Sequence, residues 1–133
     1  MLYLCGWEDP EAVLTAYNDD GSWITTLFVQ PKDILQEIWE GRRPGVEGAV
    51  KDWPIDNAVS HEDLEESLSE MLVKCSRIVV KLGVDSVVDG LVDNEIKSNS
   101  RDRQKFGLGP VSIIDPSRMI NELRLRKSDA EIE

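Results

Sequence analysis

The sequence predicts an α/β fold: a mixed β-sheet, built from an N-terminal antiparallel hairpin and βαβ units, with helices packed on it. Three observations predict it. Two strand-like runs near the N-terminus flank a turn sequence, residues 27–29 are continuously apolar, and helix-like and strand-like segments alternate through the rest of the chain. The length of 133 residues suits one domain, which can bury roughly two thirds of its unfolded surface.

The hairpin is the clearest of the predicted elements. Residues 12–17 and 22–29 are strand-like, and Asn18-Asp19-Asp20-Gly21 lies between them. All four are turn-forming residues, and Gly21 can adopt a positive φ angle without strain. The continuous run Leu27-Phe28-Val29 is typical of a strand that is buried on both faces.

The middle of the chain is predicted to be helical on either side of a loop. Asp33 begins a short helix that Gly41 ends, with an apolar face formed by Leu35, Ile38 and Trp39. The Gly and Pro residues of 42–54 predict a loop with at most one helical turn. After a short strand at 58–59, Ser60 begins a better helix, whose apolar stripe contains Leu64, Leu68, Met71, Leu72 and Cys75.

The last third of the chain alternates strands and helices. Residues 77–82 are largely β-branched and predict a buried strand. A helix follows near Asp85, with Val88, Leu91, Val92 and Ile96 on one side, and we expect it to fray over 97–105. A strand at 111–114 precedes a final helix, which Asp115-Pro116 begins. On that helix we expect Met119, Ile120 and Leu123 to face inward.

Composition excludes several classes of partner. The net charge of −11 argues against nucleic acid and against an anionic membrane surface. No apolar run approaches the length of a membrane span. The basic clusters, among them residues 101–105 and 124–127, are typical of solvated loops and helix ends. The two cysteines, Cys5 and Cys75, predict reduced thiols in a cytoplasmic protein rather than a disulfide framework.

The sequence offers no catalytic constellation. His61 is the only histidine, and its place at an acidic helix start predicts an exposed residue at the first helical position. No spacing of His and Cys is typical of a transition-metal site. Gly107-Leu108-Gly109-Pro110 lacks the residues that a phosphate-binding loop needs and predicts a turn. We therefore predict no catalytic residue, metal ligand or cofactor in this chain.

The candidate binding residues are Trp39, Arg42 and Arg43, within the run Glu-Ile-Trp-Glu-Gly-Arg-Arg-Pro-Gly at 37–45. This run places a large apolar side chain beside two cations at the end of an element. Trp and Arg are the residues most enriched at binding hot spots. The alternative is that Trp39 caps the local core and keeps its indole N–H at the rim.

Three blocks of the sequence resemble the aminopeptidase P family, the Xaa-Pro aminopeptidases. The first is Tyr-Leu-Cys-Gly-Trp followed by Glu-Asp-Pro-Glu-Ala-Val-Leu at 3–14, where Cys5 and Trp7 replace the family's Thr and Phe. The second is the run at 37–45. The third, at 123–132, resembles the passage from the N-terminal domain to the catalytic domain, and Ser128 with Glu131 there has the pattern of a helix capping box.

The resemblance implies a creatinase/prolidase-type N-terminal domain. Residues 1–126 would form that domain, without the family's first helix and strand, and residues 127–133 would begin the linker helix into an absent catalytic domain. In the family that domain binds two divalent metal ions, usually manganese, which activate water to cleave the bond before proline.

The implied function is that of a non-catalytic domain of a metal-dependent Xaa-Pro aminopeptidase, which removes the N-terminal residue preceding proline. The domain would support oligomer assembly and shape the substrate entrance, chiefly through Trp39. Its partners would be its own catalytic domain, further copies of the same protein and, through the parent enzyme, proline-containing peptides.

Two alternatives remain open. One is the N-terminal domain of a prolidase (Xaa-Pro dipeptidase), over which the run at 37–45 favours aminopeptidase P. The other is a peptidase-like binding module without catalysis, like histone-chaperone relatives that lost their metal ligands.

Overall fold

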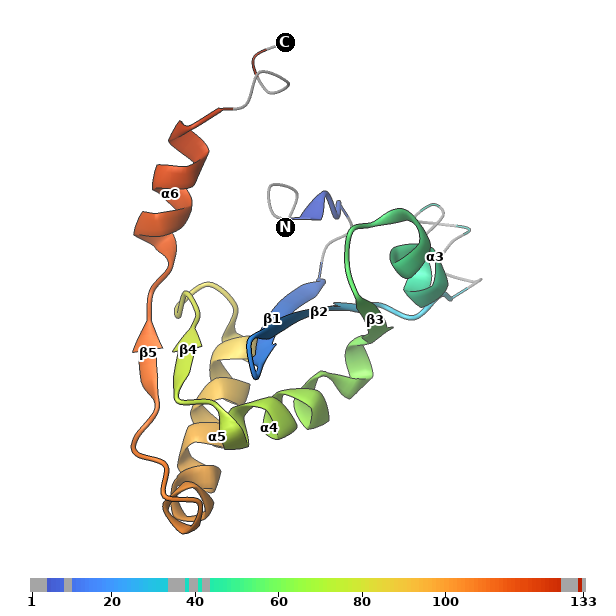
Figure 1. Ribbon diagram of the computed structural model, residues 1–133. Coiled ribbons are helices and arrows are strands. Elements are labelled where there is room, and N and C mark those ends of the chain that lie inside the picture. Colours follow the sequence, from blue (N-terminus) through green and yellow to red (C-terminus); the bar gives the residue numbers. More distant parts are fainter. Residues whose placement is uncertain are drawn as a thin grey trace. The chain divides into compact units, whose positions relative to one another are not determined.

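The computed structural model describes residues 5–8, 11–33, 38, 41, 44–127 and 132, which form two compact units, Met1–Ser67 and Leu68–Glu133. The first unit contains β1 (Val13–Asp19), β2 (Ser22–Val29), α3 (Gly45–Asp52) and β3 (Asn57–Ser60). Helix α4 (Leu64–Lys74) begins in the first unit and continues in the second, which also contains β4 (Arg77–Val79), α5 (Ser86–Lys105), β5 (Ser112–Ile114) and α6 (Ser117–Leu125). Figure 1 shows these elements, and they confirm the predicted α/β class with a mixed sheet.

The sheet of the first unit has the order β1-β2-β3. Strands β1 and β2 are antiparallel from Val13↔Phe28 to Asp19↔Ser22, whereas β2 and β3 are parallel. Between β1 and β2, Asp20 and Gly21 have φ angles of 47° and 93°. Two successive positive φ angles define the tight turn that matches the twist of a hairpin. The Gly21 N–H also donates to Asn18 Oδ1 over 2.9 Å, so the predicted hairpin is confirmed.

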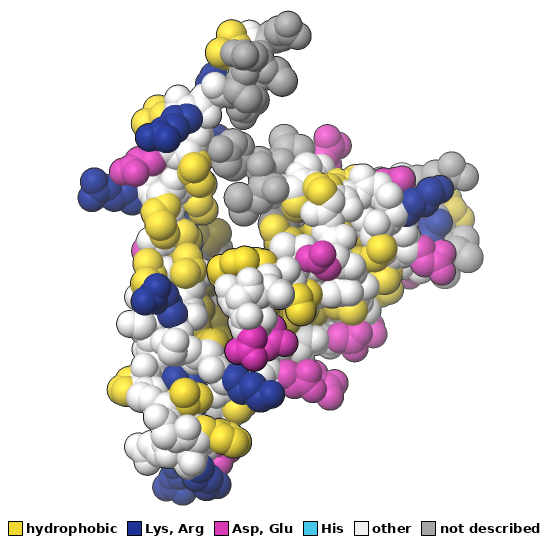
Figure 2. Space-filling model, in the orientation of Figure 1, with side chains coloured by type: hydrophobic (Ala, Val, Ile, Leu, Met, Phe, Trp, Pro, Cys, Tyr) yellow, Lys and Arg dark blue, Asp and Glu magenta, His cyan; other side chains and the backbone are white. Residues whose placement is uncertain are grey.

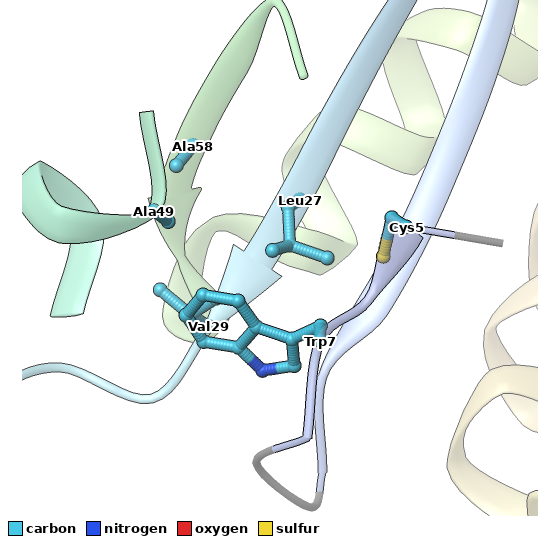
Figure 3. Close-up of a cluster of buried hydrophobic side chains, with 6 residues drawn as sticks. All are labelled: Cys5, Trp7, Leu27, Val29, Ala49 and Ala58. Carbon is cyan, nitrogen blue, oxygen red and sulfur yellow. The ribbon is translucent and has the colours of Figure 1, made fainter. Parts of the chain in front are cut away.

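The core of the first unit is built on β2. Leu27 and Phe28 are fully buried and Val29 is 1% exposed. Because side chains alternate along a strand, Leu27 and Val29 lie on one face and Phe28 on the other, so burial on both faces is confirmed. Each such side chain contributes roughly 1.5–3 kcal/mol to folding. Figure 3 shows the cluster on the first face: Cys5, Trp7, Leu27, Val29, Ala49 and Ala58.

Helix α3 corrects the prediction of a loop at 42–54. Its sequence, Gly-Val-Glu-Gly-Ala-Val-Lys-Asp, has a low helix propensity, but Ala49 is fully buried in the core and Val46 packs against that cluster. Tertiary packing therefore compensates for the glycines. At Gly48 an added Cβ would lie 2.9 Å from Pro44 Cβ, so glycine permits this close approach. Of the helix expected after Asp33, most residues lie outside the described part of the chain, and Ile38 is helical and exposed.

Helix α4 begins as predicted. The Ser60 Oγ accepts a hydrogen bond from the Glu62 N–H over 3.3 Å, and a 3₁₀ turn, His61–Asp63, leads into the helix. The predicted stripe is confirmed at Leu64, Leu68 and Leu72, which are 2–9% exposed. His61, expected to be exposed, is instead half-buried.

In the second unit, β4 and β5 are parallel and α5 connects them, as in a βαβ unit. The predicted strand at 77–82 ends at Val79, which is 54% exposed, so a buried strand is wrong here. Met119 and Leu123 of α6 are at least half exposed and do not face inward as expected. Strands β4 and β5 have three residues each, so their sheet is too small to cover the apolar face of α6. Figure 2 shows such apolar side chains on the surface over β5 and α6.

Helix α5 does not fray at 97–105 as expected but continues to Lys105. At its start, Asp85 accepts hydrogen bonds from the Val87 and Val88 N–H groups, which caps the first turn. An ion pair of 2.6 Å joins Asp93 to Lys97 on its surface. In its last turn, Arg103 is anchored inside the unit.

Arg103 is 3% exposed, although its cluster was expected to be solvated. Its guanidinium donates from Nη1 to the carbonyl oxygens of Leu72, over 3.2 Å, and Cys75, and from Nη2 to that of Gly109 over 2.9 Å. Leu72 and Cys75 lie at the C-terminal end of α4, where carbonyls lack helical partners and the helix dipole is negative. Arg103 therefore ties the end of α4 to the turn that follows α5.

Replacing Arg103 with Met should lower the free energy of unfolding by about 2–4 kcal/mol, because the carbonyls of Leu72, Cys75 and Gly109 lose a charged donor that is itself buried. Urea denaturation followed by circular dichroism measures this change. The matched control is Arg118→Met, since among the described residues Arg118 bonds Glu122 alone, on an exposed helix surface. The control should cost less than about 1 kcal/mol. Equal losses in both variants would contradict the anchoring role of Arg103.

Candidate functional site

The candidate residues Trp39, Arg42 and Arg43 lie outside the described part of the chain. The structure does describe the residues on either side of their segment, Lys32 and Gly45. An added Cβ at Gly45 would lie 3.4 Å from the Lys32 Cβ. The two ends of residues 33–44, here named the Trp39 segment, therefore meet beside the end of β2.

The backbone conformation at Gly45, the residue that follows the Trp39 segment, requires glycine. Gly45 is buried and has a φ angle of 65°, a left-handed conformation that other residues rarely adopt. It is also the first residue of α3, so the same position ends the Trp39 segment and starts a helix. A side chain here would be strained by the positive φ angle, although its Cβ would only touch Lys32 at ordinary van der Waals distance.

An aromatic pair supports this base. The rings of Trp7 and Trp53 meet edge to face with centroids 4.8 Å apart. Trp7 is 2% exposed, and its indole Nε1 is buried without a hydrogen-bond partner among the described residues. Trp53 directly follows α3, so its contact with Trp7 holds α3 in place. The first residue of α3, Gly45, directly follows the Trp39 segment. Sequence reasoning missed Trp53, and its only signal was a large aromatic residue among loop formers.

A polar link holds the chain between Trp53 and β3. The Asp56 Oδ2 accepts from the Thr25 hydroxyl over 2.6 Å and from the Thr25 N–H over 2.7 Å. In return, the Asp56 N–H donates to the Thr25 Oγ1 over 3.0 Å. The side-chain hydrogen bond, followed by the backbone one, holds the pKa of Asp56 below its usual value. The carboxylate is therefore ionised at neutral pH and links β2 to the start of β3.

The remaining titratable candidates are dispersed. Among the described residues, no three His, Cys, Asp or Glu side chains gather into a group that could hold a metal ion. Burial raises the pKa of the Cys75 thiol, which therefore stays protonated near neutral pH. Within the same part of the chain, no helix combines the length and the apolar character of a membrane span.

Replacing Gly45 with Ala should destabilise the first unit by about 1 kcal/mol or more, because it forces an L-residue into a left-handed conformation beside Lys32. The control is Gly90→Ala within α5, where an added Cβ meets nothing within 4 Å. That change should stabilise the helix by about 0.5–1 kcal/mol. Thermal unfolding of both variants measures the contrast, and a Gly45→Ala variant as stable as the wild type would refute the account of this base.

Comparison with known proteins gives consistent matches. The family described as "Aminopeptidase P, N-terminal domain" matches residues 1–80. The Xaa-Pro aminopeptidase of Escherichia coli is 28% identical over 131 residues, which cover 98% of this chain and 30% of that protein. Xaa-Pro aminopeptidase 3 of Homo sapiens is 28% identical over 142 residues, covering all of this chain and 26% of the relative. The chain thus spans less than a third of these relatives.

Solved structures agree with the sequence matches. Proline aminopeptidase P II from Yersinia pestis superposes with a TM-score of 0.85 at 30% identity, over 98% of this chain and 30% of that one. A zinc-substituted E. coli aminopeptidase P in complex with product also gives a TM-score of 0.85, at 28% identity and the same coverage.

Proposed function

The chain belongs to the family of aminopeptidase P N-terminal domains, and from this premise we propose that it is the non-catalytic N-terminal domain of a metal-dependent Xaa-Pro aminopeptidase. The parent enzyme removes an N-terminal residue that precedes proline. This domain supports assembly of the parent into a homo-oligomer and shapes the entrance through which the peptide reaches the catalytic domain.

The observation that carries this proposal is that the residues on either side of the Trp39 segment lie close together beside the end of β2. Lys32 and Gly45, which flank this segment, lie close together, since an added Cβ at Gly45 would be 3.4 Å from the Lys32 Cβ, and the fully buried Ala49 anchors α3 in the core. A loop whose flanking residues are fixed close together has fewer conformations than a loop with widely spaced, mobile ends, so it loses less conformational entropy on binding. Trp39, Arg42 and Arg43 are therefore suited to contact a substrate or a neighbouring subunit.

The metal chemistry is assigned to the catalytic domain of the parent. The zinc-substituted E. coli neighbour shows that a relative takes a divalent metal, and we propose a pair of divalent ions, manganese in the native enzyme. When bound, such ions lower the pKa of a water molecule and make it a nucleophile. The described residues of this chain do not fit that role, since no metal-binding group gathers among them.

Two further assignments follow the same reasoning. The relatives named above are Xaa-Pro aminopeptidases, which favours this activity over that of a prolidase. Two cysteines in 133 residues are too few for a disulfide framework, which favours a reducing compartment, and we propose the cytoplasm.

In the full-length parent enzyme, Trp39→Ala should change the ratio of kcat/KM between hexapeptide and tripeptide substrates by about fivefold or more, the effect of losing one hot-spot residue. Steady-state kinetics measure the ratio, and light scattering measures the oligomer mass. Phe106→Ala is the control, because Phe106 is a 68% exposed aromatic residue of the second unit. If Trp39→Ala alters neither the ratio nor the mass, Trp39 only caps the local core and its proposed role is wrong.

A further inference from the structure

Strand β2 extends beyond its neighbour β3. Its pairing with β1 continues to Asp19↔Ser22, whereas its pairing with β3 begins only at Thr26↔Asn57. Residues 22–25 of β2 therefore have a described strand on one side only. Lys and Pro, which commonly protect a sheet edge from pairing with another chain, are absent from these four positions.

The backbone of Trp23 points toward the vacant side. The Thr25 N–H donates to the Asp56 carboxylate over 2.7 Å. Asp56 directly precedes β3, which pairs with the side of β2 opposite β1, so the Thr25 N–H points away from β1. Backbone groups in an antiparallel pair repeat their direction every second residue. The N–H and C=O of Trp23 therefore point to the same side as Thr25 N–H, and no described residue bonds them there.

The side chains around this edge are aromatic and anionic. Trp23 is 65% exposed and lies on the same face of β2 as Thr25, the partner of Asp56. A cation on this face would lie near both the indole ring and the ionised Asp56 carboxylate, which Thr25 binds.

We infer that this edge, named the Trp23 edge and consisting of residues 22–25 with Asp56, binds an extended segment of a partner protein that carries arginine or lysine. The segment adds as a strand, exchanging hydrogen bonds with the Trp23 N–H and C=O. Its basic side chain lies over the indole and toward the Asp56 carboxylate. The Trp23 edge lies at the opposite end of β2 from Lys32, so the inference does not depend on the proposed peptidase role.

The test is a titration of the full 133-residue chain with an acetylated and amidated peptide, Thr-Arg-Thr-Arg-Thr, followed by heteronuclear NMR. Saturable shifts should appear at the Trp23 indole and at the backbone amides of β2. One control peptide replaces both arginines with neutral citrulline, and another replaces the central threonine with proline, which removes an amide donor. Both should bind at least about fivefold more weakly.

Variants of the protein complete the test. Trp23→Ala and Asp56→Asn should each weaken binding of the arginine peptide about threefold or more, whereas Asp93→Asn on α5 should leave the affinity within about twofold. Because Trp23 is largely exposed, Trp23→Ala keeps the fold and decides the outcome even if Asp56→Asn disturbs β3. Equal binding of the citrulline peptide, or unchanged affinity of Trp23→Ala, would overturn the inference.

Discussion

Burial of β2 on both of its faces is the constraint on which the first unit depends. Leu27, Phe28 and Val29 are at most 1% exposed, so this strand must be covered on each side and paired along its inner length. The core that covers its Leu27 face draws together α3, β3 and Trp7. The two ends of β2 then fix two surface features: the base of the Trp39 segment near Lys32, and the Trp23 edge near the hairpin turn.

Polar side chains complete what regular secondary structure leaves unpaired. In the first unit, Asp56 accepts the Thr25 N–H at the point where β3 has not yet begun. In the second, Arg103 satisfies carbonyls at the end of α4 and in the turn after α5. Each link joins segments far apart in sequence and removes the cost of a backbone group without a partner. Three buried side-chain atoms lack a hydrogen-bond partner among the described residues: Trp7 Nε1, Asp89 Oδ1 and Ser117 Oγ.

The sequence predicts the elements that depend on neighbouring residues and fails where distant contacts decide. The hairpin turn at Asp20-Gly21, the run Leu27-Phe28-Val29 and the stripe of α4 were all predictable from local patterns. Helix α3 was not, because its glycines favour a loop and only the burial of Ala49 in a remote core overrides them. Arg103 looked solvated because its partners Leu72 and Cys75 lie 31 and 28 residues away. Trp53 carried no local signal, and Trp39, Arg42 and Arg43 stay predictions.

The chain belongs to the family of aminopeptidase P N-terminal domains, and the role proposed for it is to support a larger enzyme. Its described residues form the base of the Trp39 segment and the Trp23 edge. The proposed hydrolysis takes place in another domain of the parent enzyme. The most direct measurement incubates the purified chain with manganese ions and an Xaa-Pro tripeptide and follows release of the N-terminal residue by chromatography. The proposed role predicts no release above the metal-only control. Release that rises with chain concentration and stops on chelation would contradict it.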